Sequence, residues 1–244
     1  MDTTGILIVM AGALAGGFVN GLAGFGTGLV ALGFWLHVLP PMIAGPLAVV
    51  CSVASQVQTL PAIWRAIEPR RVLPFILPGL LGVPVGMALL DRLDPGAFRI
   101  GMGLFLLAFS LFSLLSGKGM AIAWGGRIAD GVVGLMGGVL GGLCGLSGPL
   151  PTVWATLRGW GKKERRSLFQ SYNLSVLCFA LAGLALSGHL TRELGLATLA
   201  ALPGTLTGAL LGARAYRRLS DFHFNKVILC LLALSGVTLL WPGG

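Results

Sequence analysis

The chain of 244 residues is 55% hydrophobic and only 10% charged, with a mean hydropathy of +0.89. A soluble domain carries roughly a quarter charged residues, so this composition excludes a soluble globular protein. The net charge of +9 does not indicate nucleic-acid binding, because the basic residues lie in short loops beside apolar segments, where orientation bias places them. We therefore expect an all-α polytopic membrane protein.

Eight apolar stretches are long enough to cross a bilayer, which takes about 20 residues each. In chain order they cover roughly Gly5–Leu36, Met42–Trp64, Val72–Leu90, Gly96–Leu115, Ile128–Leu157, Leu168–Leu186, Leu194–Ala213 and Phe224–Trp241. The connections are short, so no soluble domain fits between them. The cysteines fall inside these stretches without paired spacing and are interpreted as small hydrophobes. The six tryptophans fit interfacial belts.

Two glycine-dense tracts lie 121 positions apart, in the first and fifth stretches. Residues 16–29 read GGFVNGLAGFGTGL and residues 137–150 read GGVLGGLCGLSGPL. Glycine weakens a helix interior, so each tract predicts a helix break. A duplicated break at matching places in two halves of a membrane chain points to a transporter's binding site.

The repeat predicts an N-terminal unit at residues 1–120 and a C-terminal unit at residues 121–244, each with four hydrophobic segments. The glycine-containing segments are 32 and 30 residues long. Each is either one tilted helix or a hairpin that returns to its starting side. Single crossings would divide the loop Lys and Arg residues 11 to 6, whereas two returning hairpins divide them 14 to 3. The positive-inside rule favours the hairpins, which would make the two repeats inverted.

The pairs Gly82-x-x-x-Gly86 and Gly208-x-x-x-Gly212 extend the repeat. We interpret both pairs as sites of close helix packing.

These features resemble the sulfite exporter family TauE/SafE over nearly the whole chain. The most specific residues run from Gly141 through Gly145, then the basic residues 163–166, and then Gln170 to Leu174. The resemblance implies a secondary transporter, an exporter by family name, of small organosulfur or related anions such as sulfite, sulfonates or sulfoacetate. It implies a multi-pass protein of a bacterial inner (plasma) membrane that contacts lipid and no nucleic acid. The oligomeric state is left open, a homodimer included.

The expected anion site is built from the two breaks and polar side chains near them. A half-helix N-terminus offers free N–H groups and the positive end of its dipole. Polar groups at membrane depth are costly and are functional candidates by default. The predicted substrate-binding residues are Asn20, Gly21, Gly24, Gly26, Thr27, Gly28, Gln56, Gly142, Gly145, Ser147, Gly148, Gln170, Tyr172 and Asn173. We expect no cofactor, no metal ligands and no catalytic residue.

Two rival functions remain. Gly145-Leu146-Ser147-Gly148 has the form of the nucleophile motif of rhomboid intramembrane proteases, with His189 or His223 as the required base. The position equivalent to Ser147 in the first tract is Gly26, which argues for a duplicated structural tract instead. The second rival is a passive anion channel.

Overall fold

The computed structural model describes residues 3–59, 68–90, 92, 94–115 and 124–216, with Val237 and Leu240 as isolated positions. All regular secondary structure in these ranges is helical, which confirms the predicted all-α class there. The helices are α1 (Thr3–Ala23), α2 (Thr27–Trp35), α3 (Pro41–Thr59), α4 (Pro69–Leu90), α5 (Pro95–Leu115), α6 (Gly126–Cys144), α7 (Pro149–Leu157), α8 (Lys162–Leu186) and α9 (Arg192–Tyr216). Apart from Val237 and Leu240, the predicted stretch at 224–241 lies outside the described residues, and so does the boundary between the two units.

Six of these helices are long and apolar enough to cross a membrane: α1, α3, α4, α6, α8 and α9. Helix α5 contains a shorter apolar run at Gly96–Ala108. Large apolar side chains point outward, such as Leu81 at 72% exposed and Leu199 at 71% exposed. An apolar outer surface on apolar helices of this length is that of a multi-pass membrane protein. The arrangement as eight segments in two inverted repeats stays a prediction.

Each glycine tract ends one helix and begins another. Helix α1 gives way to α2 at residues 24–26, and α6 gives way to α7 at residues 145–148. Gly24, Gly26 and Gly145 have φ values of +81°, +104° and +71°. Residues with a β-carbon rarely adopt these values, so glycine is required at these three positions to turn the chain.

The short helix after each break runs back along the long helix before it. Trp35 at the end of α2 donates from Nε1 to the carbonyl of Val9 in α1, at 3.0 Å. Trp154 of α7 donates from Nε1 to Asp130 Oδ1 in α6, at 2.6 Å. Both indoles are buried, at 0% and 8% exposed, so they face the protein interior and not the outer surface, and their interfacial depth stays a prediction. Each indole N–H donates a hydrogen bond inside the protein, and this bond holds the two helices of a hairpin together.

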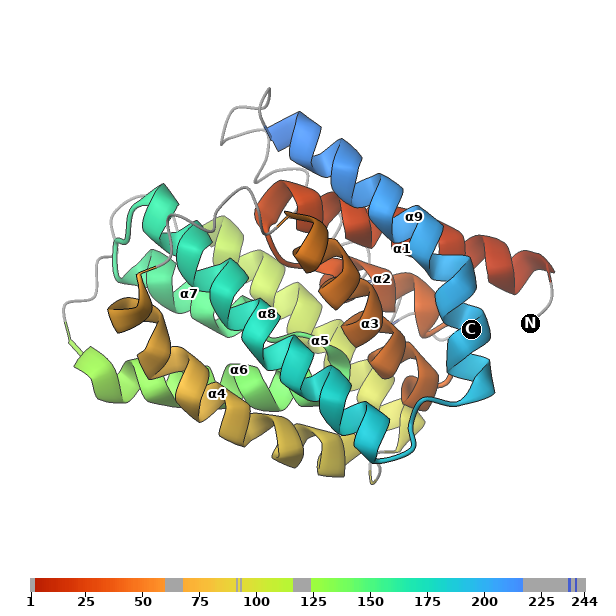
Figure 1. Cartoon of the computed structure of the whole chain (residues 1–244), viewed down its shortest axis with the longest axis horizontal. Coiled ribbons are helices and arrows are strands. Elements are labelled where there is room, and N and C mark those ends of the chain that lie inside the picture. Colours follow the sequence, from red (N-terminus) through yellow and green to blue (C-terminus); the bar gives the residue numbers. More distant parts are fainter. Residues whose placement is uncertain are drawn as a thin grey trace.

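Glycines bring two pairs of helices into backbone contact. A β-carbon at Gly17 would collide with the carbonyl of Thr205 in α9, and one at Gly138 would collide with that of Gly79 in α4. The predicted packing role of Gly82, Gly86, Gly208 and Gly212 is confirmed, because each of them lies against backbone atoms of α6 or α1. Figure 1 shows the resulting pairs, α1 with α9 and α4 with α6, at opposite sides of α3 and α8.

Residue-by-residue contacts give the helix directions. Gly17 and Gly21 meet Thr205 and Ala209 in the same order, so α1 and α9 are parallel. The contacts of α4 with α6 and α8 likewise ascend together, and α3 runs against α2, with Thr27 near Ser55 and Gly28 near Ala48. Consequently α1, α3, α7 and α9 point one way and α2, α4, α6 and α8 point the other.

Two helix breaks that meet at the centre

The two breaks lie in contact with each other, although they are 121 positions apart in the sequence. A β-carbon added to Gly148 would lie 3.0 Å from the ring of Phe25. One added to Gly28 would lie 2.9 Å from Leu146 Cδ2. Because these glycines have no β-carbon, side chains of one tract pack against the backbone of the other. The two interrupted helices therefore share one buried centre.

The first break is surrounded by a network of buried polar groups on α1, α2 and α3. The Asn20 amide donates from Nδ2 to Ser55 Oγ. The hydroxyls of Thr27 and Ser55 lie 3.4 Å apart. The amide of Gln56 donates from Nε2 to the carbonyl of Gly24 at 3.0 Å. Three predicted side chains thus converge on the point where α1 ends.

The second break is more completely hydrogen-bonded. The hydroxyl of Ser147 donates to Asn173 Oδ1 on α8. At the end of α6, the N–H of Gly145 bonds to Gly141 O at 2.9 Å and that of Leu146 bonds to Leu140 O at 3.2 Å. This pattern is a glycine-terminated helix cap. Ser147 and Asn173, predicted as site neighbours, are direct partners.

Gln170 joins the two halves. Its Nε2 donates to Thr59 Oγ1 of α3 at 2.9 Å, and its side chain is fully buried. Its neighbour Phe169 stacks edge-on against Phe25 of the first break, with ring centroids 5.7 Å apart. Helix α8 therefore contributes to both breaks, through Gln170 at the first and Asn173 at the second.

Four predicted site residues lie in helix packing or turn geometry. Gly21 lies against the Ala209 backbone and Gly142 against the Val83 backbone, each without room for a β-carbon. The Tyr172 hydroxyl donates to Gly134 O at 2.5 Å, between α8 and α6. A β-carbon on Gly26 would lie 2.9 Å from Val19 Cγ1. Their part in substrate binding stays a prediction.

Two polar residues at the centre were not singled out from the sequence, Ser55 and Thr59. They complete a stripe on α3 with Ser52 and Gln56, at spacings i, i+3, i+4 and i+7. That spacing places all four on one helix face. Three of them are buried and Thr59 is half-buried. The stripe was the available signal, because a polar face on an apolar helix must point into the protein.

The surroundings of Ser147 do not suit a nucleophile. Its proton goes to the amide oxygen of Asn173, and an amide is not a general base. His189 follows the end of α8 at Leu186. The 13 residues from Asn173 to that end span roughly 20 Å of helix. His223 lies outside the described residues.

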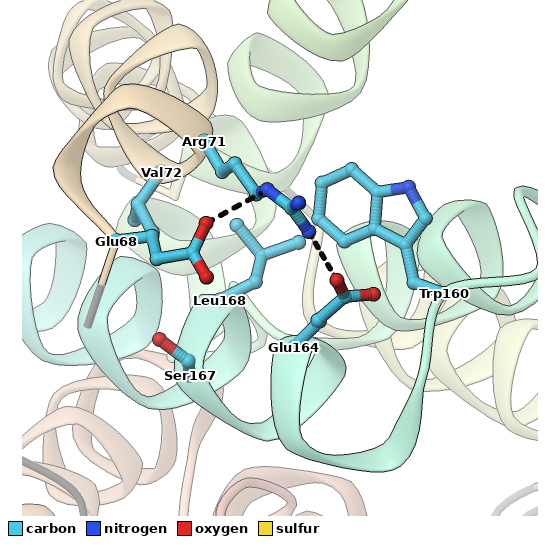
Figure 2. A pocket seen from close by; sticks show the side chains of 7 residues that line it. All are labelled: Glu68, Arg71, Val72, Trp160, Glu164, Ser167 and Leu168. Atoms are coloured by element: carbon cyan, nitrogen blue, oxygen red, sulfur yellow. Dashed lines mark hydrogen bonds and ion pairs between the residues drawn. The ribbon is translucent and has the colours of Figure 1, made fainter. Parts of the chain in front are cut away.

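A small surface pocket opens at one end of the bundle, away from the breaks. Figure 2 shows Arg71 of α4 between the carboxylates of Glu68 and Glu164, beside Trp160. The ion pair to Glu68 measures 2.8 Å, and Glu164 of α8 also bonds to Arg71. The Gly161 N–H at 3.0 Å and Arg71 together hold the pKa of Glu164 below its usual value. Two carboxylates against one guanidinium make this pocket an unsuitable anion site.

Taken together, fold and site define a multi-pass helical membrane protein in which two interrupted helices meet at a buried polar centre. The model of the sulfite exporter TauE/SafE family matches residues 8–239, and the chain belongs to this family. Members are membrane transporters, so the chain is a transporter of the sulfite or anion exporter type. No curated protein and no solved structure matches the chain.

Proposed function

We propose that this protein is a secondary transporter that exports small organosulfur or related anions, such as sulfite, sulfonates or sulfoacetate, by alternating access around the two helix breaks. The observation that carries the proposal is the contact between the breaks. One break from each half of the chain lies at the same buried centre, with Phe25 against Gly148. A ligand held there touches both halves, and movement of one half against the other would expose it to either side.

The helix ends at this centre suit an anion. Helix α2 begins at Thr27 after Gly26, and no side chain caps its N-terminus. The first N–H groups of a helix have no partner within it, and the dipole is positive there. Buried hydroxyls of Thr27 and Ser147 lie at the two breaks. The N–H groups at the start of α2 support binding of an oxyanion by hydrogen bonds, whereas the Ser147 proton is already donated to Asn173 Oδ1.

The helix directions support an inverted repeat. Helix α1 of the first half packs in parallel on α9 of the second, and α6 of the second half packs in parallel on α4 of the first. Each long broken helix, α1 or α6, therefore packs on the equivalent helix of the other half. The two broken helices α1 and α6 run in opposite directions. A symmetric pair of halves supplies two equivalent packings, as alternating access requires.

The distribution of arginine supports an orientation. Arg70, Arg71, Arg127, Arg158, Arg165 and Arg214 lie at the ends of helices that, by their directions, share one side of the bundle. Arg92 and Arg192 lie at the opposite side. We therefore assign the arginine-rich side to the cytoplasm. Expelling one negative charge from an inside-negative cell then gains about 2.3 kcal/mol per 100 mV.

Flux in proteoliposomes tests the function. We expect vesicles that contain the purified protein to release sulfite, thiosulfate or sulfoacetate faster than protein-free vesicles, with saturation and counterflow. Asn20→Ala and Ser147→Ala should lower the flux while the protein elutes as a folded species in detergent. Absence of flux for all three anions would refute the proposal. Single-channel currents without counterflow would identify an anion channel instead.

A further inference from the structure

Three buried amide oxygens at the first break have no hydrogen-bond partner. They are Asn20 Oδ1, Gln56 Oε1 and Gln170 Oε1. The three side chains are at most 1% exposed. Leaving a buried acceptor unpaired costs about 1–3 kcal/mol. Three such atoms around one break make it a candidate ligand site.

The orientation of Gln56 follows from its partner. Its amide contacts the carbonyl oxygen of Gly24 at 3.0 Å. A carbonyl oxygen can only accept, so the amide must present nitrogen to Gly24. The oxygen Oε1 is therefore turned away from Gly24 O and remains an acceptor.

Gln170 and Asn20 are oriented by hydroxyls whose single proton is used elsewhere. Thr59 Oγ1 donates to the carbonyl of Ser55 at 3.0 Å, so it accepts from Gln170 Nε2. Ser55 Oγ donates to the carbonyl of Cys51 or Ser52, at 3.0 Å each, so it accepts from Asn20 Nδ2. Both amides must again present nitrogen to the protein and leave oxygen for a ligand.

The three amides lie around the end of α1. The Gly24 carbonyl accepts from Gln56, and Asn20, which bonds to Ser55 next to Gln56, lies one helical turn before Gly24, whose backbone N–H bonds to the Asn20 backbone carbonyl at 2.7 Å. Gly24 is itself buried. Among the described residues beyond its chain neighbours, only Gln170 Oε1 comes within 4.0 Å of the position of an added β-carbon. Open space therefore adjoins Gly24, and the oxygen of Gln170 borders it.

We propose that this space binds an alkali-metal cation, coordinated by the amide oxygens of Asn20, Gln56 and Gln170. The site offers acceptors, which a cation requires. Its three amide ligands are neutral, and the described part of the chain has no group of three His, Cys, Asp or Glu residues that could hold a metal, so a monovalent cation fits better than a divalent one.

The second break provides a contrast within the same molecule. Ser147 is paired with Asn173, and no unpaired buried side-chain atom occurs at that break among the described residues. The cation site therefore lies at the first break and not at the second. Its ligands are uncharged amides and not carboxylates.

The inference deepens the proposed function by naming a cation that binds beside the transported anion. Cation binding itself is measurable without any anionic substrate. We expect the apparent melting temperature of the purified protein to rise with concentration in NaCl or KCl, relative to N-methyl-D-glucamine chloride at equal ionic strength. The difference between the sodium and potassium titrations identifies the preferred ion.

Two variants and a matched control locate the site. Gln56→Met and Gln170→Met should each abolish or strongly reduce the alkali-specific rise. Gln58→Met removes a glutamine two residues along α3, on the opposite face, and should retain the rise. An equal rise in all three chlorides, or no rise in any, would overturn the inference and leave water as the occupant of the space. A rise that persists in both variants would also overturn it.

The outcome is separable from that of the proposed function. An alkali-specific rise without flux of any tested anion would refute the transport proposal and leave the cation site standing. Anion flux without an alkali-specific rise would do the reverse.

Discussion

At the residue scale, the buried centre is held by amide and hydroxyl groups that bond across helices. Asn20 bonds to Ser55, Gln170 to Thr59 and Ser147 to Asn173. Each bond joins residues of two different segments of the bundle. The same side chains therefore position the breaks and present the remaining polar atoms to the centre.

The Ser147–Asn173 pair gives a prediction at this scale. Ser147→Ala leaves the Asn173 acceptor without its donor, so we expect lower thermal stability in detergent. A double-mutant cycle with Asn173→Ala should give a coupling free energy of about 0.6 kcal/mol and at most about 1.7 kcal/mol, the average and the maximum for hydrogen bonds between membrane helices. A coupling near zero would show that the hydrogen bond does not form in the protein.

At the element scale, buried hydrogen bonds hold the two helical hairpins together inside the bundle. An ion pair connects α4 to α8 at the surface of the bundle. The indoles of Trp35 and Trp154 hold α2 on α1 and α7 on α6. Arg71 connects the start of α4 to Glu164 at the start of α8. The buried bonds are shielded from water, whereas the ion pair is exposed and responds to pH and salt.

The Arg71–Glu164 pair predicts a pH dependence. Because the folded protein lowers the pKa of Glu164, the carboxylate stabilises the fold above the unfolded pKa, and this contribution is lost as pH falls through the folded pKa. Glu164→Gln should therefore be less stable than wild type at pH 7 and similar to it at low pH. Glu193→Gln, a matched change in the first turn of α9, should not reproduce that pattern. A difference in melting temperature between wild type and Glu164→Gln that stays constant from pH 7 to pH 3 would contradict the prediction.

At the scale of the whole molecule, the parallel and antiparallel contacts determine which helix ends share a side of the bundle. Helices α6 and α8 are parallel, with Tyr172 against Gly134 and Val176 against Gly141. The start of α6 and the end of α8 are therefore on opposite sides. A chain with eight single crossings would place them on the same side.

Cysteine labelling tests this sidedness. Arg127 and Ser187 are exposed at those two ends. We expect Arg127→Cys to react with a charged maleimide only in inside-out vesicles, and Ser187→Cys only in right-side-out vesicles. The wild-type protein measures any background from its own thiols. Labelling of both variants from one side would exclude the hairpin topology.

Much of the fold could be predicted from the sequence. Long apolar stretches predict the helices, the glycine tracts predict where two of them end, and the Gly-x-x-x-Gly pairs predict close packing. Backbone conformation depends on a few neighbouring residues, and exclusion from water depends on composition. Both can therefore be read from the sequence. For the same reason, Trp35 could not be placed: its partner Val9 lies in another helix.

The candidate site was predicted only in outline. Residues of the two tracts and of α8 meet as expected, but Ser55 and Thr59 emerged only from their contacts. The sequence also could not show whether the nitrogen or the oxygen of each amide bonds to the protein. That choice depends on hydrogen-bond partners up to 111 positions away.

The sequence by itself determined that this is an all-helical membrane protein with two glycine breaks, because hydrophobicity and glycine's backbone freedom are local properties. The tertiary structure alone decided that the breaks touch each other and that three amide oxygens around the first break stay without partners. Those facts arise from contacts between distant segments, where each hydrogen bond made by one atom decides which atom is left for a ligand.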